Sequence, residues 1–172
     1  RIEVLVPIEF DDWSLDEAGM IAKAWELLQR KVVADAPAVK AYVMGVDVAR
    51  FGNDKTKIRI WDGWVVIKKE ILEKKSTKEV AERIKEMQAE YKVPPSNTVI
   101  DEDGIGGGVI DHWPKNSVKG FIANSKPINQ KANENYENLK AQCAYIVADK
   151  VKKKEVYEPE ENADEQELLI ED

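Results

Sequence analysis

The chain has 172 residues, of which 43% are hydrophobic and 34% charged, a balance typical of one folded domain with its own core. Its formal charge of −7 at pH 7 argues against a protein that coats nucleic acid, so any phosphate contacts must come from local groups of lysines. No apolar run reaches the roughly 20 residues of a membrane helix, and a single cysteine, Cys143, excludes an internal disulfide and fits a reducing compartment.

The first 40 residues predict a helical lead-in. SLDE, residues 14–17, is a capping box, and apolar residues follow it at helical spacing as far as Leu28. DAPAVK, residues 35–40, then interrupts the helical pattern. We therefore expect residues 1–40 to be a lead-in or linker and residues 41–172 to form the main domain.

Residues 42–72 predict three strands joined by tight turns. An apolar strand covers about 42–49 and runs into the turn RFGND. The second strand, about 57–62, alternates apolar and basic residues and ends at Asp62-Gly63, a hairpin signal. The third strand covers about 64–72.

From residue 76 onward the pattern alternates between helices and single strands. STKE, residues 76–79, is a second capping box, and Val80, Ile84 and Met87 follow it at helical spacing. The later expected elements are a strand running into Asp101, a glycine loop leading to a short helix, a strand at 118–123, a long helix at 133–151 and an acidic, poorly patterned tail from about 155.

This order predicts an α/β fold of the ribonuclease H-like class. Such a fold has a mixed sheet of three antiparallel strands followed by parallel strands, flanked by α-helices. In it the first and fourth predicted strands are neighbours.

Two aspartates would then lie side by side. Asp47 sits in the first predicted strand, and Asp101 ends the fourth, 54 positions later. Two carboxylates that close do not both stay ionised cheaply, and a divalent cation relieves the conflict. Oxygen ligands suit Mg²⁺ or Mn²⁺, and two such ions can support phosphodiester cleavage. We therefore expect Asp47 and Asp101 to be catalytic metal ligands.

Asp47 itself and several polar residues near it can each be interpreted in two ways. Asp47 could instead be satisfied by an arginine or by backbone donors. Asp103 is either a third metal ligand or a turn former. Asp54 and Thr56 are candidates for metal ligation or for a supporting layer around the metal, although an Asx-type turn that holds the hairpin is the slightly favoured interpretation of Asp54.

The remaining polar features are less specific. GIGGG, residues 104–108, either lets a phosphate backbone approach or packs a short helix tightly. The lone His112 and Cys143 are expected to be structural. The candidate DNA-phosphate contacts are lysines near the hairpin and after the last helix: Lys55, Lys57, Lys68, Lys69, Lys152 and Lys153.

Three segments together resemble the nuclease domain of the large terminase subunit of tailed bacteriophages. They are GVDVARFGNDKT, VIDEDGIGGGVIDHW and NENYENLKAQCAYIV, and the resemblance covers about residues 42–150. It implies a metal-dependent endonuclease that cuts concatemeric double-stranded viral DNA in the cytoplasm of the bacterial host, with Asp47 and Asp101 matching two of three catalytic acids.

The resemblance also implies partners and one departure. The family's nuclease domain follows a packaging ATPase domain and works with a small terminase subunit and a portal. Its third acid usually stands in a Ser-Pro-Asp-like segment near the C-terminus, which this sequence lacks. Asp164 and Asp172 lie at that end in different contexts, so we expect the domain to be missing its C-terminal end.

Two rival functions belong to other classes. A non-catalytic docking module of the packaging motor would explain the missing acid and the negative charge. An ATP-binding domain of the actin or sugar-kinase type shares a related fold, but those proteins carry two such halves. A Holliday-junction resolvase is a nearer relative of the preferred function.

Overall fold

The structure is a computed structural model that describes residues 5–7, 42–49, 55–130 and 134–159. Its helices and strands, in chain order, are β1 (Leu5–Pro7), β2 (Val43–Asp47), β3 (Lys55–Asp62), β4 (Val65–Glu73), α2 (Thr77–Tyr91), the 3-10 turn η2 (Pro95–Asn97), β5 (Thr98–Asp101), α3 (Gly106–Ile110), β6 (Lys119–Phe121), α4 (Leu139–Lys152) and β7 (Tyr157–Pro159).

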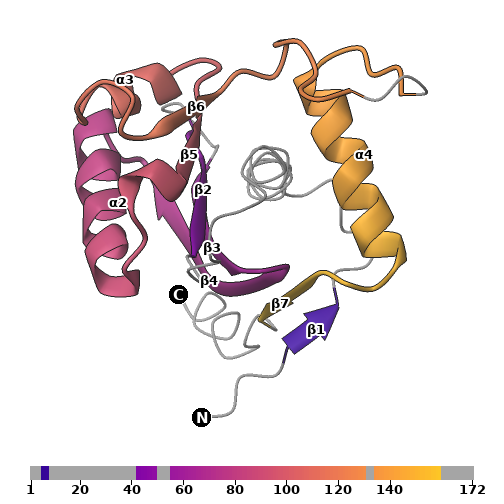
Figure 1. Cartoon of the computed structure of the whole chain (residues 1–172). Helices are drawn as coiled ribbons and strands as arrows, with labels where there is room; N and C mark the ends of the chain where they lie inside the picture. Colours follow the sequence, from indigo (N-terminus) through magenta and orange to yellow (C-terminus); the bar gives the residue numbers. More distant parts are fainter. Residues whose placement is uncertain (1–4, 8–41, 50–54, 131–133, 160–172) are drawn as a thin grey trace, which may run out of the picture.

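A mixed sheet separates two layers of helices, with α2 and α3 on one face and α4 on the other (Figure 1). Within the described ranges the sheet has seven strands in the order β1-β7-β4-β3-β2-β5-β6. β2, β3 and β4 form an antiparallel meander, while β5 joins β2 and β6 joins β5 in parallel. The predicted ribonuclease H-like arrangement of three antiparallel strands followed by parallel strands is confirmed.

Each face of the sheet has its own apolar core, because side chains alternate along every strand. On the α4 face, Val43 and Val99 pack with Cys143 and Val147 of α4. On the opposite face, Val46 packs with side chains of α2 and α3. The central strand β2 is buried on both faces, which explains its continuous apolar sequence.

The second capping box forms as its sequence predicts. The Ser76 hydroxyl accepts a hydrogen bond from the Glu79 backbone N–H at 3.3 Å, and the Glu79 carboxylate accepts one from the Ser76 N–H at 2.9 Å. These reciprocal bonds satisfy two donors that the helix itself leaves unpaired. In the described part of the chain no helix is both long and apolar enough to cross a bilayer.

The long helix begins later than the sequence pattern suggested. The expected start was near residue 133, whereas α4 begins at Leu139. Asn138 is the reason, because its backbone is extended and its side chain accepts a hydrogen bond from the Ala141 N–H at 2.8 Å. An asparagine in this role ends the preceding loop and starts the helix.

One edge of the sheet comes from segments in which no strand was expected. β7 lies in the tail that was expected to be unpatterned, and β1 lies in the expected helical lead-in. The two strands pair antiparallel, and β7 also pairs with β4 through Val65 and Tyr157. Buried Arg59 of β3 donates to Glu158 of β7 at 3.1 Å and helps to hold this edge. The division at residue 40 stays a prediction, since residues 8–41 lie outside the described ranges.

Candidate metal and DNA site

The parallel register of β2 and β5 brings Asp47 and Asp101 to the same level. The pairs Met44–Thr98, Gly45–Val99 and Val46–Ile100 differ by a constant 54 positions. Continuing this register by one residue places Asp47 beside Asp101, at the carboxyl ends of the two strands. Ligands of open α/β sheets bind at that edge.

Both carboxylates face the α4 side of the sheet. Asp47 is four residues after Val43, and Asp101 is two residues after Val99, and both valines belong to the core under α4. An even spacing along a strand keeps side chains on one face. Both aspartates are partly buried, so they stand where the apolar core gives way to solvent.

The electrostatics of Asp101 reflect this crowding. Burial raises the pKa of the Asp101 carboxyl, and the nearby charges of Asp47 and Asp103 raise that pKa further. A backbone hydrogen bond from Asp103 and the charge of Lys140 lower the pKa in part. The net effect disfavours the charged form, as expected for like charges that share a partly desolvated site. A bound cation would reverse that balance.

Asp103 makes two specific hydrogen bonds. Its backbone N–H donates to Oδ1 of Asp101 at 3.0 Å, and its own Oδ2 accepts from the backbone N–H of Ala123 at 2.9 Å. Ala123 lies just beyond β6, twenty positions along the chain. The carboxylate of Asp103 therefore joins two loops at the edge of the sheet.

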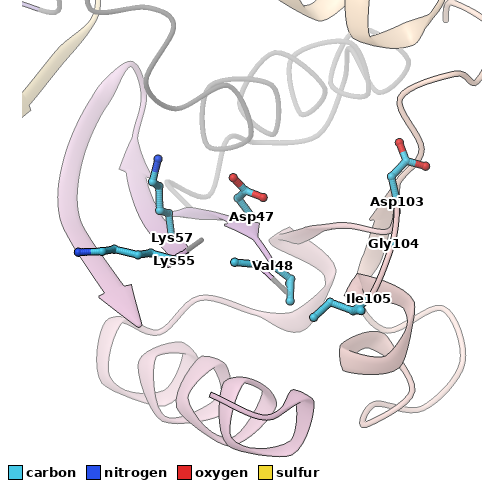
Figure 2. Close-up of a pocket in the computed structure, with 8 residues that line it drawn as sticks. Asp47, Val48, Lys55, Lys57, Asp103, Gly104 and Ile105 are labelled. Carbon is cyan, nitrogen blue, oxygen red and sulfur yellow. The ribbon is translucent and has the colours of Figure 1, made fainter. Parts of the chain in front are cut away.

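A cleft of about 440 Å³ opens between the end of β2, the start of β3 and the loop after β5 (Figure 2). Asp47 and Lys57 point to the same side of the sheet, and Asp103 rises from the opposite wall (Figure 2). The lining residues are Asp47, Val48, Ala49, Lys55, Lys57, Asp103, Gly104 and Ile105. The cleft thus brings two of the predicted acids, Asp47 and Asp103, together with two of the predicted DNA-contacting lysines, while Asp101 does not line it.

Of the two lysines that line the cleft, Lys57 lies directly beside Asp47 in the sheet. It is the cross-strand partner of Asp47 in the antiparallel β2–β3 ladder, so the two side chains share the α4 face. Lys55 lies on the same face two residues earlier and forms an ion pair with Glu73 at 2.6 Å. A basic neighbour therefore lies beside Asp47, although it is a lysine and not the arginine considered as an alternative for this residue.

Thr56 lies on the other face of the sheet from Asp47. It alternates with Lys57 along β3, is buried, and its hydroxyl accepts a hydrogen bond from the Ala49 N–H at 3.1 Å. This bond fixes the chain where it leaves β2. The predicted role of Thr56 beside the metal stays a prediction, and Asp54 lies outside the described residues.

The other predicted lysines are dispersed. A bulge in the β3–β4 ladder leaves Lys68 opposite Ile60 on the α2 face, while Lys69 is opposite Arg59 on the α4 face. Lys152 and Lys153 end α4, and Lys153 is paired with Asp149 at 2.7 Å. α4 has 14 residues and is therefore about 20 Å long, so Lys152 and Lys153 lie at the opposite end of this helix from Lys140, whose charge acts on Asp101.

Sequence reasoning missed Lys140 at the start of α4. Its backbone N–H donates to the Ala123 carbonyl at 3.1 Å, and its charge acts on Asp101. No local motif marks this lysine, because its place depends on how α4 docks after β6.

The glycine segment has a packing role at Gly106. A Cβ atom at this position would lie 1.6 Å from the backbone oxygen of Asp101. The first turn of α3 therefore contacts the end of β5, and the atom that approaches closely is the chain's own backbone. Gly104 has a φ of +91°, which favours glycine, and it lines the cleft.

The donor set partly fits a divalent cation. Asp47 and Asp101 supply carboxylate oxygens, which Mg²⁺ and Mn²⁺ prefer, and Mg²⁺ often uses only one or two carboxylates together with water and substrate phosphate. Among the residues that the structure describes, no three His, Cys, Asp or Glu side chains gather as a metal cluster. Asp164 and Asp172 lie outside those residues.

Neither a family model nor a curated protein sequence matches the chain. Among solved structures, the chain is similar to the nuclease domain of the large terminase subunit of bacterial virus Sf6, with 19% identity, a TM-score of 0.56 and coverage of 79% of this chain and 64% of that one. Point-mutant forms of that protein solved with manganese and beta-thujaplicinol, and with calcium, give TM-scores of 0.55 and 0.56.

This similarity confirms the fold that the sequence motifs implied. At 19% identity it shows a shared architecture, namely an α/β sheet of the kind found in phage terminase nuclease domains. The chain spans about 64% of the length of the solved domain.

Proposed function

We propose that the chain is the metal-dependent nuclease domain of a phage large terminase, which cleaves concatemeric double-stranded viral DNA during genome packaging. The observation that carries the proposal is the common level of Asp47 and Asp101 at the carboxyl ends of neighbouring parallel strands. The shared fold with the Sf6 nuclease domain, which has been solved with manganese and with calcium, supports it.

Asp47 and Asp101 would hold Mg²⁺ or Mn²⁺ in a two-ion arrangement completed by water and substrate phosphate. When bound, the metal supplies an activated water and stabilises the leaving oxygen of the cleaved phosphodiester. Asp101 is oriented for this work because the N–H of Asp103 holds its Oδ1. The apolar residues Val48 and Ile105 also line the cleft.

Lys55 and Lys57 would hold the DNA backbone, whereas Lys68 lies on the other face of the sheet. Lys57 and Lys55 line the cleft on the same face as Asp47, where a phosphate approaching the metal would meet them. Such contacts carry no base information, so the proposal includes cleavage with little sequence preference.

The proposed setting follows from the same family. The domain would act in the cytoplasm of the bacterial host as part of a large subunit that also contains a packaging ATPase domain. Its partners would be double-stranded DNA, a small terminase subunit and the portal.

Plasmid nicking tests this function. The chain should convert supercoiled plasmid to nicked and linear forms with Mn²⁺ and with Mg²⁺, and EDTA should abolish the conversion. Asp47→Asn and Asp101→Asn should each lose it, whereas Lys68→Met, on the other face of the sheet, should retain it. Cleavage that persists in both aspartate variants would refute the site.

A non-catalytic docking module of the packaging motor is the second candidate. The observation that favours it is the lack of a third acidic or histidine ligand among the described residues. In that case the wild-type chain would neither bind Mn²⁺ nor nick plasmid, and Asp47→Asn would change nothing in its handling of DNA.

A further inference from the structure

We propose that Asp103 is a positioning residue that fixes the Asp101 carboxylate and the exit of β6, and that it is not a metal ligand. This inference rests on the proposed nuclease site and assigns a different role to one of its predicted ligands. Three features of the structure carry it.

The first feature is the hydrogen bond by which the Asp103 backbone orients the Asp101 carboxylate. The Asp103 N–H donates to Oδ1 of Asp101 at 3.0 Å, which restricts rotation of the carboxylate and fixes the direction of Oδ2. A ligand oxygen that is already oriented loses less freedom when a cation binds. Contacts of this supporting kind are typically worth 10- to 100-fold in metal affinity or activity.

The second feature is the direction of the Asp103 carboxylate. Its Oδ2 accepts from the Ala123 N–H at 2.9 Å, and this charge-assisted bond reaches across to the chain beyond β6. Asp103 is therefore not the local turn former considered from the sequence, since its side chain bonds a backbone group twenty positions away. In Figure 2 its carboxylate stands on the far wall of the cleft from Asp47.

The third feature is the continuation of this link into α4. The Ala123 carbonyl accepts from the Lys140 N–H at 3.1 Å, and the Ser125 carbonyl accepts from the Leu139 N–H at 2.7 Å. The start of α4 is thus docked on the segment that Asp103 holds. A substitution at Asp103 keeps the backbone N–H that holds Asp101, so its effect on Asp101 would come through loss of the link to Ala123, which also supports the end of α4 nearest the acids.

Among the described residues, Asp103, Asp47 and Asp101 do not form a group of three side chains that could hold a metal ion. A carboxylate already committed to a backbone amide would have to release that amide to reach a cation. The released N–H of Ala123 would then need a new acceptor.

The test compares Asp103→Asn with Asp103→Ala in the full chain. Both substitutions remove the same charge, but only asparagine keeps an oxygen that can accept from Ala123. Glu102→Gln is the matched control, because it removes one neighbouring charge from a side chain that lies against Gly120, away from the acids. Mn²⁺ affinity is measured by electron paramagnetic resonance, and the Ala123 amide is followed by NMR hydrogen exchange with and without Mg²⁺.

Asp103→Ala should speed exchange at Ala123 and weaken Mn²⁺ binding about tenfold. Asp103→Asn should stay within about threefold of the wild type in Mn²⁺ affinity and keep Ala123 protected, and Mg²⁺ should not speed exchange at Ala123 in the wild type. Equal losses in both variants, as large as that of Asp101→Asn, would overturn the inference while leaving the nuclease site intact. A wild-type chain that binds no Mn²⁺ would overturn the proposed function and this inference together.

Discussion

Asp47 and Lys57 are direct cross-strand partners in the β2–β3 ladder, and both face the cleft at the carboxyl end of β2. A lysine in this place has two opposing effects. Its charge attracts DNA phosphates, but it also repels a cation that binds to Asp47.

Lys57→Met should separate these effects. Without DNA, Mn²⁺ affinity should rise by up to about fivefold, corresponding to the roughly 1 kcal/mol upper range of a cross-strand charge pair. With DNA and Ca²⁺, affinity should fall and its salt dependence should decrease by about one phosphate contact. Lys68→Met, on the α2 face, is the control and should change neither quantity. Weaker Mn²⁺ binding by Lys57→Met would show that the lysine supports the metal site instead.

Gly106→Ala should destabilise the protein by about 3 kcal/mol, because a new Cβ would clash with the backbone oxygen of Asp101. Gly108→Ala is the matched control in the same short helix, where the new Cβ would meet only Cγ2 of Thr77 at 3.5 Å. It should be neutral or slightly stabilising, since alanine favours a helix over glycine. Urea denaturation of the two variants measures the difference, and equal stabilities would contradict the packing at Gly106.

The capping box gives a pH-dependent prediction. The pKa of the Glu79 carboxyl is lowered to about 2, chiefly by the backbone N–H of Ser76. A lowered pKa means that this contribution to stability is present above the usual glutamate pKa of about 4.3 and is lost as the pH falls toward about 2.

Glu79→Gln should therefore be less stable than the wild type at pH 7, and the difference should shrink between pH 4 and pH 2 as the Glu79 carboxylate of the wild type is protonated. Urea denaturation at several pH values measures this difference. A constant difference across that range would show that Glu79 does not contribute through the box.

Cys143 should report unfolding. Burial in the core under α4 raises the pKa of its thiol to about 12. At pH 8 only about 10⁻⁴ of the thiol in the folded protein is then the reactive thiolate. Alkylation by iodoacetamide should be slow in buffer and should accelerate through the urea transition. Fast labelling of the native protein would contradict the burial of α4 against the sheet.

Local patterns predicted the parts of this fold that depend on neighbours in sequence. The box of Ser76 and Glu79 was visible because its residues are three apart, and the level of Asp47 with Asp101 followed from the predicted strand order. The strands β1 and β7 were not visible, because three-residue strands carry too little alternation to mark and their pairing is distant in sequence.

In the candidate site, too, local sequence patterns predicted only the features that do not depend on distant packing. The candidate ligands Asp47 and Asp101 were found from the strands that carry them. The partner of Asp103, namely Ala123, and the lysine of α4, Lys140, depend on how β6 and α4 dock, which no short motif encodes. Thr56 was grouped with the acids by closeness in sequence, although strand alternation places its side chain on the opposite face from Asp47.

The central claim is that Asp47 and Asp101 together form one cation-binding site. A double-mutant cycle of Mn²⁺ binding tests this claim most directly. Calorimetric titration would compare the wild type with Asp47→Asn, Asp101→Asn and the double variant. If the two aspartates share the site, each single substitution should weaken binding about tenfold or more, and the double variant should lose little beyond that. Losses that simply add, or single variants that bind as the wild type does, would contradict a shared metal site at the ends of β2 and β5.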